Sequence, residues 1–422
     1  ALPAPHASAE PGVSGGGLRV GGGSAAYKAC LRARLLSEVG HEVHVVPTRA
    51  ALEFVGRPTW EALSGHPVHT EVFDDVPDVE HIRLAERADA IVVAPATADL
   101  LARLAGGHAD DLLTTTVLAT SAPVLLAPAM HTGMWQNAAT VDNVATLRRH
   151  GLVVKAPATG RLTGRDSGPG RLPDPDEIAE FVDLLITVPE CAAAMAQQDL
   201  AGKRVVISLG GTREAIDPVR YLGNSSSGRM GRAIAQVAAA RGADVHVVAA
   251  HVDVAIPSDV QITRIDSTED LAEAMDDLAK QADIVIQAVA AADFAPVAVD
   301  TKIKKPERDD ATGATMGLQL HPTPELLARL CSLSVQNRIV VGFAAETAPD
   351  RDQFLKLAQA KLARKGCDLM VVNDVSGGKV FGKVGTDVTM VHQQGPGRRI
   401  TGSKSQAAVA ILDEVRALLA TQ

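Results

Sequence analysis

The sequence predicts two doubly wound α/β domains in tandem. Short apolar runs of strand length alternate with helical stretches, and glycine-rich or hydroxyl-rich turns follow several of these runs. The alternation begins near residue 18, stops in a proline-containing connector, and begins again at Lys203. A chain of 422 residues has room for two or three domains, at roughly 100–200 residues each.

We therefore expect four segments. Residues 1–16 are rich in Ala, Pro, Ser and Gly, which is typical of a disordered lead-in. Residues 17–187 form the first domain, and residues 203–422 form the second. Residues 188–202 contain a proline and few charges, which indicates a linker between the two domains.

Composition and charge narrow the class of protein. Aromatic residues make up only 3% of the chain, so Ala, Val, Leu and Gly must fill the cores, as in parallel sheets covered by helices. The net charge of −9 and the lack of a sustained basic run argue against nucleic acid or an anionic membrane as a partner. No apolar stretch reaches the length of a membrane span. The four cysteines are scattered without a CxxC pair, which predicts a reduced, cytoplasmic protein without a structural zinc site.

The first domain is predicted to alternate strands and helices. The expected elements are a strand at Leu18–Val20, a helix at Ser24–Val39 closed by Gly40, strands at His44–Pro47, Ala90–Ala94 and Pro123–Ala127, and a helix at Asp176–Thr187. Parallel strands collect ligands at their carboxyl ends, so the turns after the strands are the candidate site.

Four turns in the first domain carry small residues and hydroxyl groups. They are Gly22–Lys28, Pro47–Ala50, Ala94–Ala98 and Pro128–Trp135. Such residues suit a phosphate and a flat ring, but each turn alone is equally typical of any strand-to-helix connection.

In this order, and with His81 in Val79–Ala85, the turns resemble the flavin-dependent cysteine decarboxylases, which are flavodoxin-like proteins. The resemblance covers about residues 18–187. It implies FMN on Gly23, Ser24, Thr48 and Thr97, and it implies that His81 acts in the oxidation of a substrate thiol. Taken alone, a histidine before an apolar helix is more typical of a solvated residue. A flavin suits this chemistry, because an aminoalkyl carboxylate has no electron sink of its own until its thiol is oxidised.

Two positions depart from that family. His131 stands where the family has an asparagine that contacts the substrate carboxylate; we expect His131 and Met134 to bind substrate. Gly164 stands where a cysteine of the mobile flap, here residues 163–171, protonates an intermediate. Another proton donor, such as His131 or a water molecule, then has to serve, or the domain is impaired.

The second domain opens with its most unusual stretch. An apolar run at Arg204–Leu209 leads into Gly210–Gly231, and a helical segment follows from Arg229 to Arg241. Strand, glycine-rich loop and helix N-terminus together are typical of an anion-binding turn. The spacing is not that of a dinucleotide fingerprint or a Walker loop, so the loop alone names no ligand. Further strands are expected at Asp244–Ala249, Asp283–Ala288, Arg338–Thr347 and Asp368–Asn373, with a capped helix start at Ser267–Asp270.

The pattern GGTRE-x-IDPVR-x(3)-N-x-SSG resembles the opening of the phosphopantothenate–cysteine ligases. The resemblance spans about residues 203–418 and implies a Rossmann-like α/β ligase domain. Additional matching motifs are Ala291–Phe294, Lys302–Lys305, Gly342–Thr347, and Lys361 and Lys365 with Asp368 and Asn373. Taken alone, the lysines at 302–305 are as typical of a solvated loop.

The second resemblance implies CTP as co-substrate and Mg²⁺ with its triphosphate, without naming a metal ligand. The implied nucleotide-binding residues are Asp293, Lys302, Phe343, Lys361 and Lys365. Asn224 is expected to hold the acyl intermediate, Lys302 and Lys304 to act in catalysis, and Arg220 to bind substrate.

Together the two resemblances predict a fused enzyme that acts on 4′-phosphopantothenate, cysteine and CTP and yields 4′-phosphopantetheine. The alternative is a working ligase whose flavin domain is only a binding or assembly module, because of Gly164. A nicotinamide-linked oxidoreductase is disfavoured, since G-x-G-x-x-G with a downstream acid is missing. The resemblance also implies a homo-oligomer: trimers of flavin domains and dimers of ligase domains, giving a dodecamer.

Overall fold

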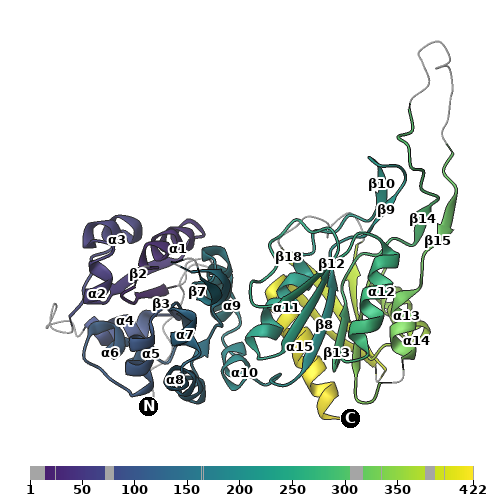
Figure 1. The fold of residues 1–422 in the computed structure, drawn as a ribbon. Coiled ribbons are helices and arrows are strands. Elements are labelled where there is room, and N and C mark those ends of the chain that lie inside the picture. The colour runs from purple at the N-terminus through teal and green to yellow at the C-terminus, as the bar shows by residue number, and fades with distance from the viewer. Residues whose placement is uncertain are drawn as a thin grey trace. The chain divides into compact units, whose positions relative to one another are not determined.

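The computed structural model describes most of the chain as two compact units, residues 1–199 and 200–422 (Figure 1). The described residues are 15–23, 25–71, 80–162, 164, 166–304, 317–333, 335–375, 385–393 and 395–421. Ser24 and most of the proposed lead-in, residues 1–14, lie outside them, as do Thr163 and Arg165 of the flap. Each unit is a doubly wound α/β layer structure, which confirms the predicted fold class.

The first unit is built on a parallel sheet of five strands in the order β2-β1-β3-β4-β5. Its strands are β1 (Gly15–Val20), β2 (Glu42–Pro47), β3 (Ala90–Ala96), β4 (Val124–Pro128) and β5 (Val153–Val154), with a separate antiparallel hairpin of β6 (Ala158–Arg161) and β7 (Ser167–Arg171). Its helices are α1 (Ala26–Glu38), α2 (Arg49–Leu52), α3 (Arg57–Ser64), α4 (Glu80–Arg87), α5 (Ala98–Ala105), α6 (Leu112–Ala119), α7 (Thr132–Trp135), α8 (Ala138–Arg149), α9 (Pro175–Thr187) and α10 (Cys191–Gln197). The strand order reverses between β1 and β3, which is where open α/β sheets bind ligands.

Both faces of this sheet are buried, because alternate side chains of the central strands pack against helices on either side. On one face Ile91 and Val93 join an apolar cluster with leucines of α5 and α6. Helices α1 and α9 contact β3 and each other. Ala26, Ala29 and Ala33 are fully buried on α1, and their small side chains let the helix lie close to the strands.

Two boundaries differ from the sequence prediction. Gly15 and Gly16, expected in the lead-in, belong to β1, because they pair with Glu42 and Val43 of β2. Residues 191–197, expected in the linker, form α10, which contacts β5 and α8. Its alanines and Met195 are apolar enough to bury one side of a helix.

The second unit carries a sheet of eight strands in the order β12-β11-β8-β13-β16-β17-β18-β19. The strands are β8 (Arg204–Leu209), β11 (Asp244–Ala249), β12 (Gln261–Arg264), β13 (Ile284–Gln287), β16 (Ile339–Glu346), β17 (Leu369–Asp374), β18 (Gly385–His392) and β19 (Gly395–Ser403). The first six run parallel, and β18 and β19 add antiparallel to one edge. Five of the parallel strands were predicted, and β12, β18 and β19 were not.

Helices cover both faces of this sheet, and two small strand pairs lie beside it. The helices are α11 (Arg229–Ala240), α12 (Thr268–Ala279), α13 (Leu326–Ser332), α14 (Arg351–Lys365) and α15 (Lys404–Ala420). The strand pairs are β9 (Arg213–Ala215) with β10 (Tyr221–Gly223), and β14 (Phe294–Pro296) with β15 (Leu320–Pro322). Figure 1 shows both pairs projecting from the end of the sheet. Among the described residues, no helix is both long and apolar enough to cross a membrane.

Candidate active sites

A cavity of about 740 Å³ lies at the carboxyl ends of β1 to β4 in the first unit. Its volume is within the range of roughly 300–1,000 Å³ that is typical of small-molecule sites. Gly23, Thr48 and Thr97, three of the four residues expected to hold FMN, line it; Ser24 lies outside the described residues. Other lining residues come from the turn after β4 and include Met130 and Met134.

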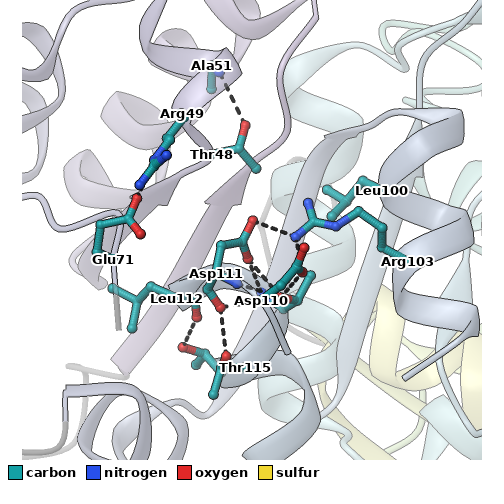
Figure 2. Close-up of polar contacts among 12 residues, drawn as sticks. Thr48, Arg49, Ala51, Glu71, Leu100, Arg103, Asp110, Asp111, Leu112 and Thr115 are labelled. Carbon is teal, nitrogen blue, oxygen red and sulfur yellow. Dashed lines mark hydrogen bonds and ion pairs between the residues drawn. The ribbon is translucent and has the colours of Figure 1, made fainter. Parts of the chain in front are cut away.

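The two threonines are held in place by capping the helices that follow them, and Figure 2 shows the contact that Thr48 makes. Thr48 Oγ1 accepts a hydrogen bond of 3.2 Å from Ala51 N at the start of α2. Thr97 Oγ1 accepts one of 3.2 Å from Leu100 N at the start of α5. Threonine suits the N-cap because its side chain replaces a missing helical acceptor. The same residue type therefore ends the strand, starts the helix and faces the cavity.

Glycine at position 22 allows two of these turns to touch. A Cβ atom added to Gly22 would lie 2.3 Å from Cβ of Ala50, so the backbone after β1 packs directly on the turn after β2. This close approach leaves backbone, rather than side chains, at the wall of the cavity. Such a wall, with two hydroxyls and a methionine pair, fits a flat ring and a phosphate.

Charged side chains around this cavity are paired with one another. Arg49 Nε lies 2.6 Å from Glu71 Oε1. Arg103 Nη2 lies 2.9 Å from Asp111 Oδ2 and also contacts Asp110 (Figure 2). The hydrogen bond from Arg103 holds the pKa of Asp110 below its usual value. Four acidic and two basic side chains line the cavity, so its positive potential must come from backbone N–H groups.

The C-terminal part of the flap forms β7, which pairs with β6 and contacts the turn after β4. Met130 N donates a hydrogen bond of 3.0 Å to Gly170 O. Gly170 has a φ of 150°, and a Cβ atom there would lie 2.2 Å from Met130 O. His131 Nε2 lies 2.9 Å from Asp166 Oδ2, so a side-chain contact adds to the backbone one. His131 Nδ1 accepts from Gly133 N at 3.1 Å, which leaves Nε2 as the protonated nitrogen toward Asp166.

Gly164 lies beside this contact. A Cβ atom added there would lie 2.7 Å from Oδ1 of Asp166. A side chain at 164 would therefore require the carboxylate end of Asp166 to move. The two departures found in the sequence, at 131 and 164, meet at one carboxylate.

His81 lies apart from these residues. It occupies the first turn of α4, is half-buried, and does not line the cavity around Gly23 and Thr48. Its Nδ1 atom is buried and has no hydrogen-bond partner among the described residues. An orphaned buried nitrogen costs free energy unless a ligand or another group satisfies it.

The second unit has a cavity of about 880 Å³ at the carboxyl ends of β8, β13, β16 and β17. The N-terminus of α11, from Gly228 to Gly231, forms part of its wall. The residues that sequence analysis predicted for nucleotide and acyl binding and that line this cavity are Asn224, Asp293, Phe343, Lys361 and Lys365. The first and last of them, Asn224 and Lys365, lie 141 residues apart in the chain.

Backbone pairing brings the Gly210 loop to the end of β13. Ala290 N donates to Gly210 O at 2.8 Å, and Thr212 N donates to Ala290 O at 3.2 Å. Thr212 Oγ1 accepts from Ala292 N at 2.9 Å, and Asn224 Nδ2 donates to Ala291 O at 2.7 Å. Asn224 is thus held against the segment that carries Asp293.

Four basic and three acidic side chains line the second cavity. Lys361 Nζ lies 2.7 Å from Glu346 Oε1, and Lys365 contacts Glu325. Lys404, at the start of α15, was missed because no local motif marks it. Burial and the nearby charge of Arg229 lower the pKa of Lys404.

Two amides in this cavity were given no role from the sequence, although one of them, Asn373, belongs to a motif noted there. Gln287 ends β13 and Asn373 lies near the end of β17, and both line the cavity. The side-chain oxygen of each is buried without a hydrogen-bond partner among the described residues. Their position at the ends of predicted parallel strands was the available signal, since polar residues there face ligands.

Lys302, Lys304 and Arg220 do not line this cavity. Arg220 instead contacts Ile303 O and lies 3.5 Å from Asp217 Oδ2. Asp217 Oδ2 accepts from Ile303 N at 3.1 Å. Burial raises the pKa of Asp217, but hydrogen bonds from three backbone N–H groups and the charge of Arg220 outweigh it and lower the pKa. These contacts fasten the exposed Lys302 and Lys304 to the β9–β10 pair.

Comparison with known families matches both units. The family model described as "DNA/pantothenate metabolism flavoprotein C-terminal domain" matches residues 200–419, and the model described as "Flavoprotein" matches residues 17–187. The chain is 49% identical to the coenzyme A biosynthesis bifunctional protein CoaBC of Mycobacterium bovis over 415 residues, covering 95% of this chain and 96% of that protein.

Two further proteins extend the comparison. The chain is 39% identical to CoaBC of Vibrio vulnificus over 406 residues, covering 95% of this chain and 97% of that protein. A crystal structure of the C-terminal domain of a CoaBC protein superimposes with a TM-score of 0.43 at 30% identity, covering 53% of this chain and all of that chain.

Proposed function

We propose two successive reactions for this chain, which belongs to the family of coenzyme A biosynthesis bifunctional proteins CoaBC. The C-terminal unit joins cysteine to 4′-phosphopantothenate with CTP. The N-terminal unit then decarboxylates the product to 4′-phosphopantetheine with FMN. The observation that carries the proposal is the gathering of Asn224, Asp293, Phe343, Lys361 and Lys365 around one cavity.

The ligase cavity suits an anionic nucleotide. Lys361, Lys365 and Lys404 offset charge on the triphosphate, and the backbone N–H groups at the start of α11 add to their potential. Mg²⁺ enters with CTP, and the carboxylates of Asp253 and Asp293 on the cavity wall are ligands of the type that it prefers.

Amide formation proceeds in two steps. A carboxylate oxygen of 4′-phosphopantothenate attacks the α-phosphorus of CTP, forming an acyl-cytidylate and releasing pyrophosphate. The amine of cysteine then attacks the acyl carbon, loses a proton to solvent and releases CMP. Asn224 Nδ2, now bonded to Ala291 O, lies at the wall where it can hold the acyl oxygen.

The N-terminal cavity fits FMN, which Gly23, Thr48 and Thr97 would hold. When bound, the flavin supplies the electron sink that the substrate lacks. His81 offers a buried Nδ1 that can take or hold a proton near the substrate thiol. His131, paired with Asp166, would supply the proton that the decarboxylated product takes up: as an imidazolium stabilised by the carboxylate, it gives up one proton and returns to the neutral imidazole. The pair of His131 and Asp166 would thus replace the cysteine that is absent from position 164.

Product analysis tests both halves together. Purified protein is incubated with 4′-phosphopantothenate, CTP, Mg²⁺ and cysteine, and the products are identified by mass. We expect pyrophosphate, CMP, CO₂ and 4′-phosphopantetheine. Accumulation of phosphopantothenoylcysteine on a flavin-loaded protein would establish the alternative, a working ligase with a flavin unit that only binds. Omission of CTP, or its replacement by ATP, tests whether CTP is the co-substrate of the ligase reaction.

We also propose that the chain is a homo-oligomer, up to a dodecamer. Apolar side chains on and beside the two strand pairs of the second unit are 42–67% exposed; they are Val219, Tyr221, Phe294, Val297, Val299, Leu318 and Leu320. Such a surface favours pairing of ligase units. Lys302 and Lys304 lie beside the same strand pairs, so they are available to a second chain. Light scattering after gel filtration measures the number of chains in the oligomer.

We further propose a cytoplasmic location, because the free cysteines are scattered through the chain.

A further inference from the structure

Two histidines and a glutamate that line neither cavity meet at the edge strand of the first sheet. Glu42 and His44 lie two residues apart on β2, so their side chains point to the same face. His66 comes from the turn after α3. A carboxylate oxygen of Glu42 and a ring nitrogen of each histidine all lie within 4.8 Å of one another.

The two imidazoles converge on one oxygen atom. Glu42 Oε1 lies 3.0 Å from His44 Nε2 and 3.7 Å from His66 Nε2. The second distance is too long for a hydrogen bond, so the carboxylate satisfies only one ring. The rings stack with centroids 4.3 Å apart and an interplanar angle of 24°.

The backbone fixes this arrangement. Gly65 ends α3 in the left-handed region, with a φ of 71°, and turns the chain toward β2. Ser64 Oγ lies 3.3 Å from both the N and the O atom of His66. Val68, two residues on, is fully buried and anchors the turn. The three side chains are therefore brought together by folded structure rather than by one mobile loop.

We propose that Glu42, His44 and His66 bind a divalent transition-metal ion of the zinc type, with water as the fourth ligand. Imidazole nitrogen and carboxylate oxygen are a common zinc set, whereas Mg²⁺ and Ca²⁺ prefer oxygen alone. Bonds of about 2.0–2.1 Å in a tetrahedron place ligand atoms about 3.3 Å apart. The separations of 3.0 and 3.7 Å from Glu42 Oε1 bracket that value. One of the two stacked rings would turn to bring its nitrogen toward the same ion, because nearly parallel ring planes do not share a metal position. The ion would tie the turn after α3 to β2.

Zinc titration of the full-length, chelator-treated protein tests the site. Calorimetry with ZnCl₂ compares the wild type with a His44→Gln/His66→Gln double variant and with His69→Gln, a matched control. His69 is half-buried near the same turn but outside the cluster. We expect the wild type and the control to bind one zinc more than the double variant, and MgCl₂ to give no such difference. Glu42→Gln should weaken that zinc by about tenfold or more.

Two further readouts separate binding from misfolding. Zinc should raise the melting temperature of the wild type and of His69→Gln, but not that of the double variant. Affinity should fall from about pH 8 to about pH 6, because only unprotonated imidazole binds metal. Flavin absorbance and ligase turnover check that the double variant is folded. Equal zinc stoichiometry and affinity in the wild type and the double variant would overturn the proposal, as would absence of binding at about 100 μM zinc.

Discussion

The two cavities occupy the same place in similar sheets but present opposite charge. Four of the six ionisable side chains on the wall of the first cavity are acidic, and its arginines are already paired with carboxylates. The second has four basic side chains and the N-terminus of a twelve-residue helix. The first can hold an anion only through backbone N–H groups, whereas in the second Lys361 and Lys365, each of which contacts a carboxylate, add their charge to the backbone N–H groups of the helix N-terminus. A shared architecture thus leaves chemistry to the turns that end its strands.

The substitution His81→Asn should separate the reactions of the two units most strongly. We expect decarboxylation to fall by roughly 10³-fold, because an amide cannot exchange protons as imidazole does. Ligation should be unchanged, since the two reactions use different units. Mass analysis of accumulated phosphopantothenoylcysteine, with flavin absorbance as the check on loading, measures the effect. Normal 4′-phosphopantetheine formation by the variant would remove His81 from the mechanism.

Asn224→Asp makes the reverse separation. The change replaces the donor to Ala291 O by a carboxylate, which also repels an acyl oxygen. Amide formation should fall by roughly 10²–10³-fold, the usual effect of losing one oxyanion donor. Pyrophosphate release that depends on CTP should continue and is measured in the same assay. Loss of both signals would show that Asn224 acts earlier than proposed.

His131→Gln tests whether the flap pair supplies a proton. Glutamine keeps hydrogen-bonding capacity but does not titrate, so decarboxylation should fall by about 10²-fold and lose part of its pH dependence. His150→Gln, at the exposed end of α8, is the control histidine. A variant with unchanged rate and pH profile would leave water as the donor.

Lys361→Met probes the charge of the second cavity. We expect the KM for CTP to rise about tenfold, because one cation near the phosphates is lost. Lys356→Met removes an exposed lysine of the same helix that does not line the cavity, and it should leave KM unchanged. Equal effects of the two substitutions would point to general electrostatics rather than a phosphate contact.

Asp217→Asn should have the smallest effect. The pKa of Asp217 in the folded chain is lower than its ordinary value of 3.8, so the ionised carboxylate contributes stability above that pH. This contribution is lost as the pH falls through the lowered pKa. At neutral pH the variant should melt at a slightly lower temperature and turn over a few-fold more slowly, because Lys302 and Lys304 are held less firmly. In thermal melts from about pH 7 to about pH 3, the wild type should lose its advantage at the acid end.

The buried strands were predictable, and the added edges were not. Runs such as Val205–Ile207 and Ile339–Val341 are continuous and apolar because helices cover both faces. β12 and β14 are short and carry mainly exposed or partly exposed residues, so no apolar run marks them. The assignment of α10 to the linker has a different reason: an alanine-rich segment fits either a linker or a helix until another surface buries it.

Side-chain placement was predictable only where a strand end fixes it. Thr48 and Thr97 face the first cavity because they directly follow the ends of β2 and β3, and Phe343 lines the second cavity from within β16. Lys302 and Arg220 lie on irregular segments, and their position depends on Asp217, whose bond to Ile303 spans 86 residues of sequence. No local pattern encodes such a contact. Lys404 was missed for the same reason, since its helix begins about 40 residues after Lys365.

The crowding at Asp166 has a consequence for how such sequences change over time. Restoring a cysteine at 164 would place its Cβ 2.7 Å from Oδ1 of Asp166, which is held by His131. A side chain at 164 would displace the Asp166 carboxylate, so the residues at 131, 164 and 166 are coupled through one contact. We expect related sequences to carry cysteine with asparagine or glycine with histidine, and seldom a mixture.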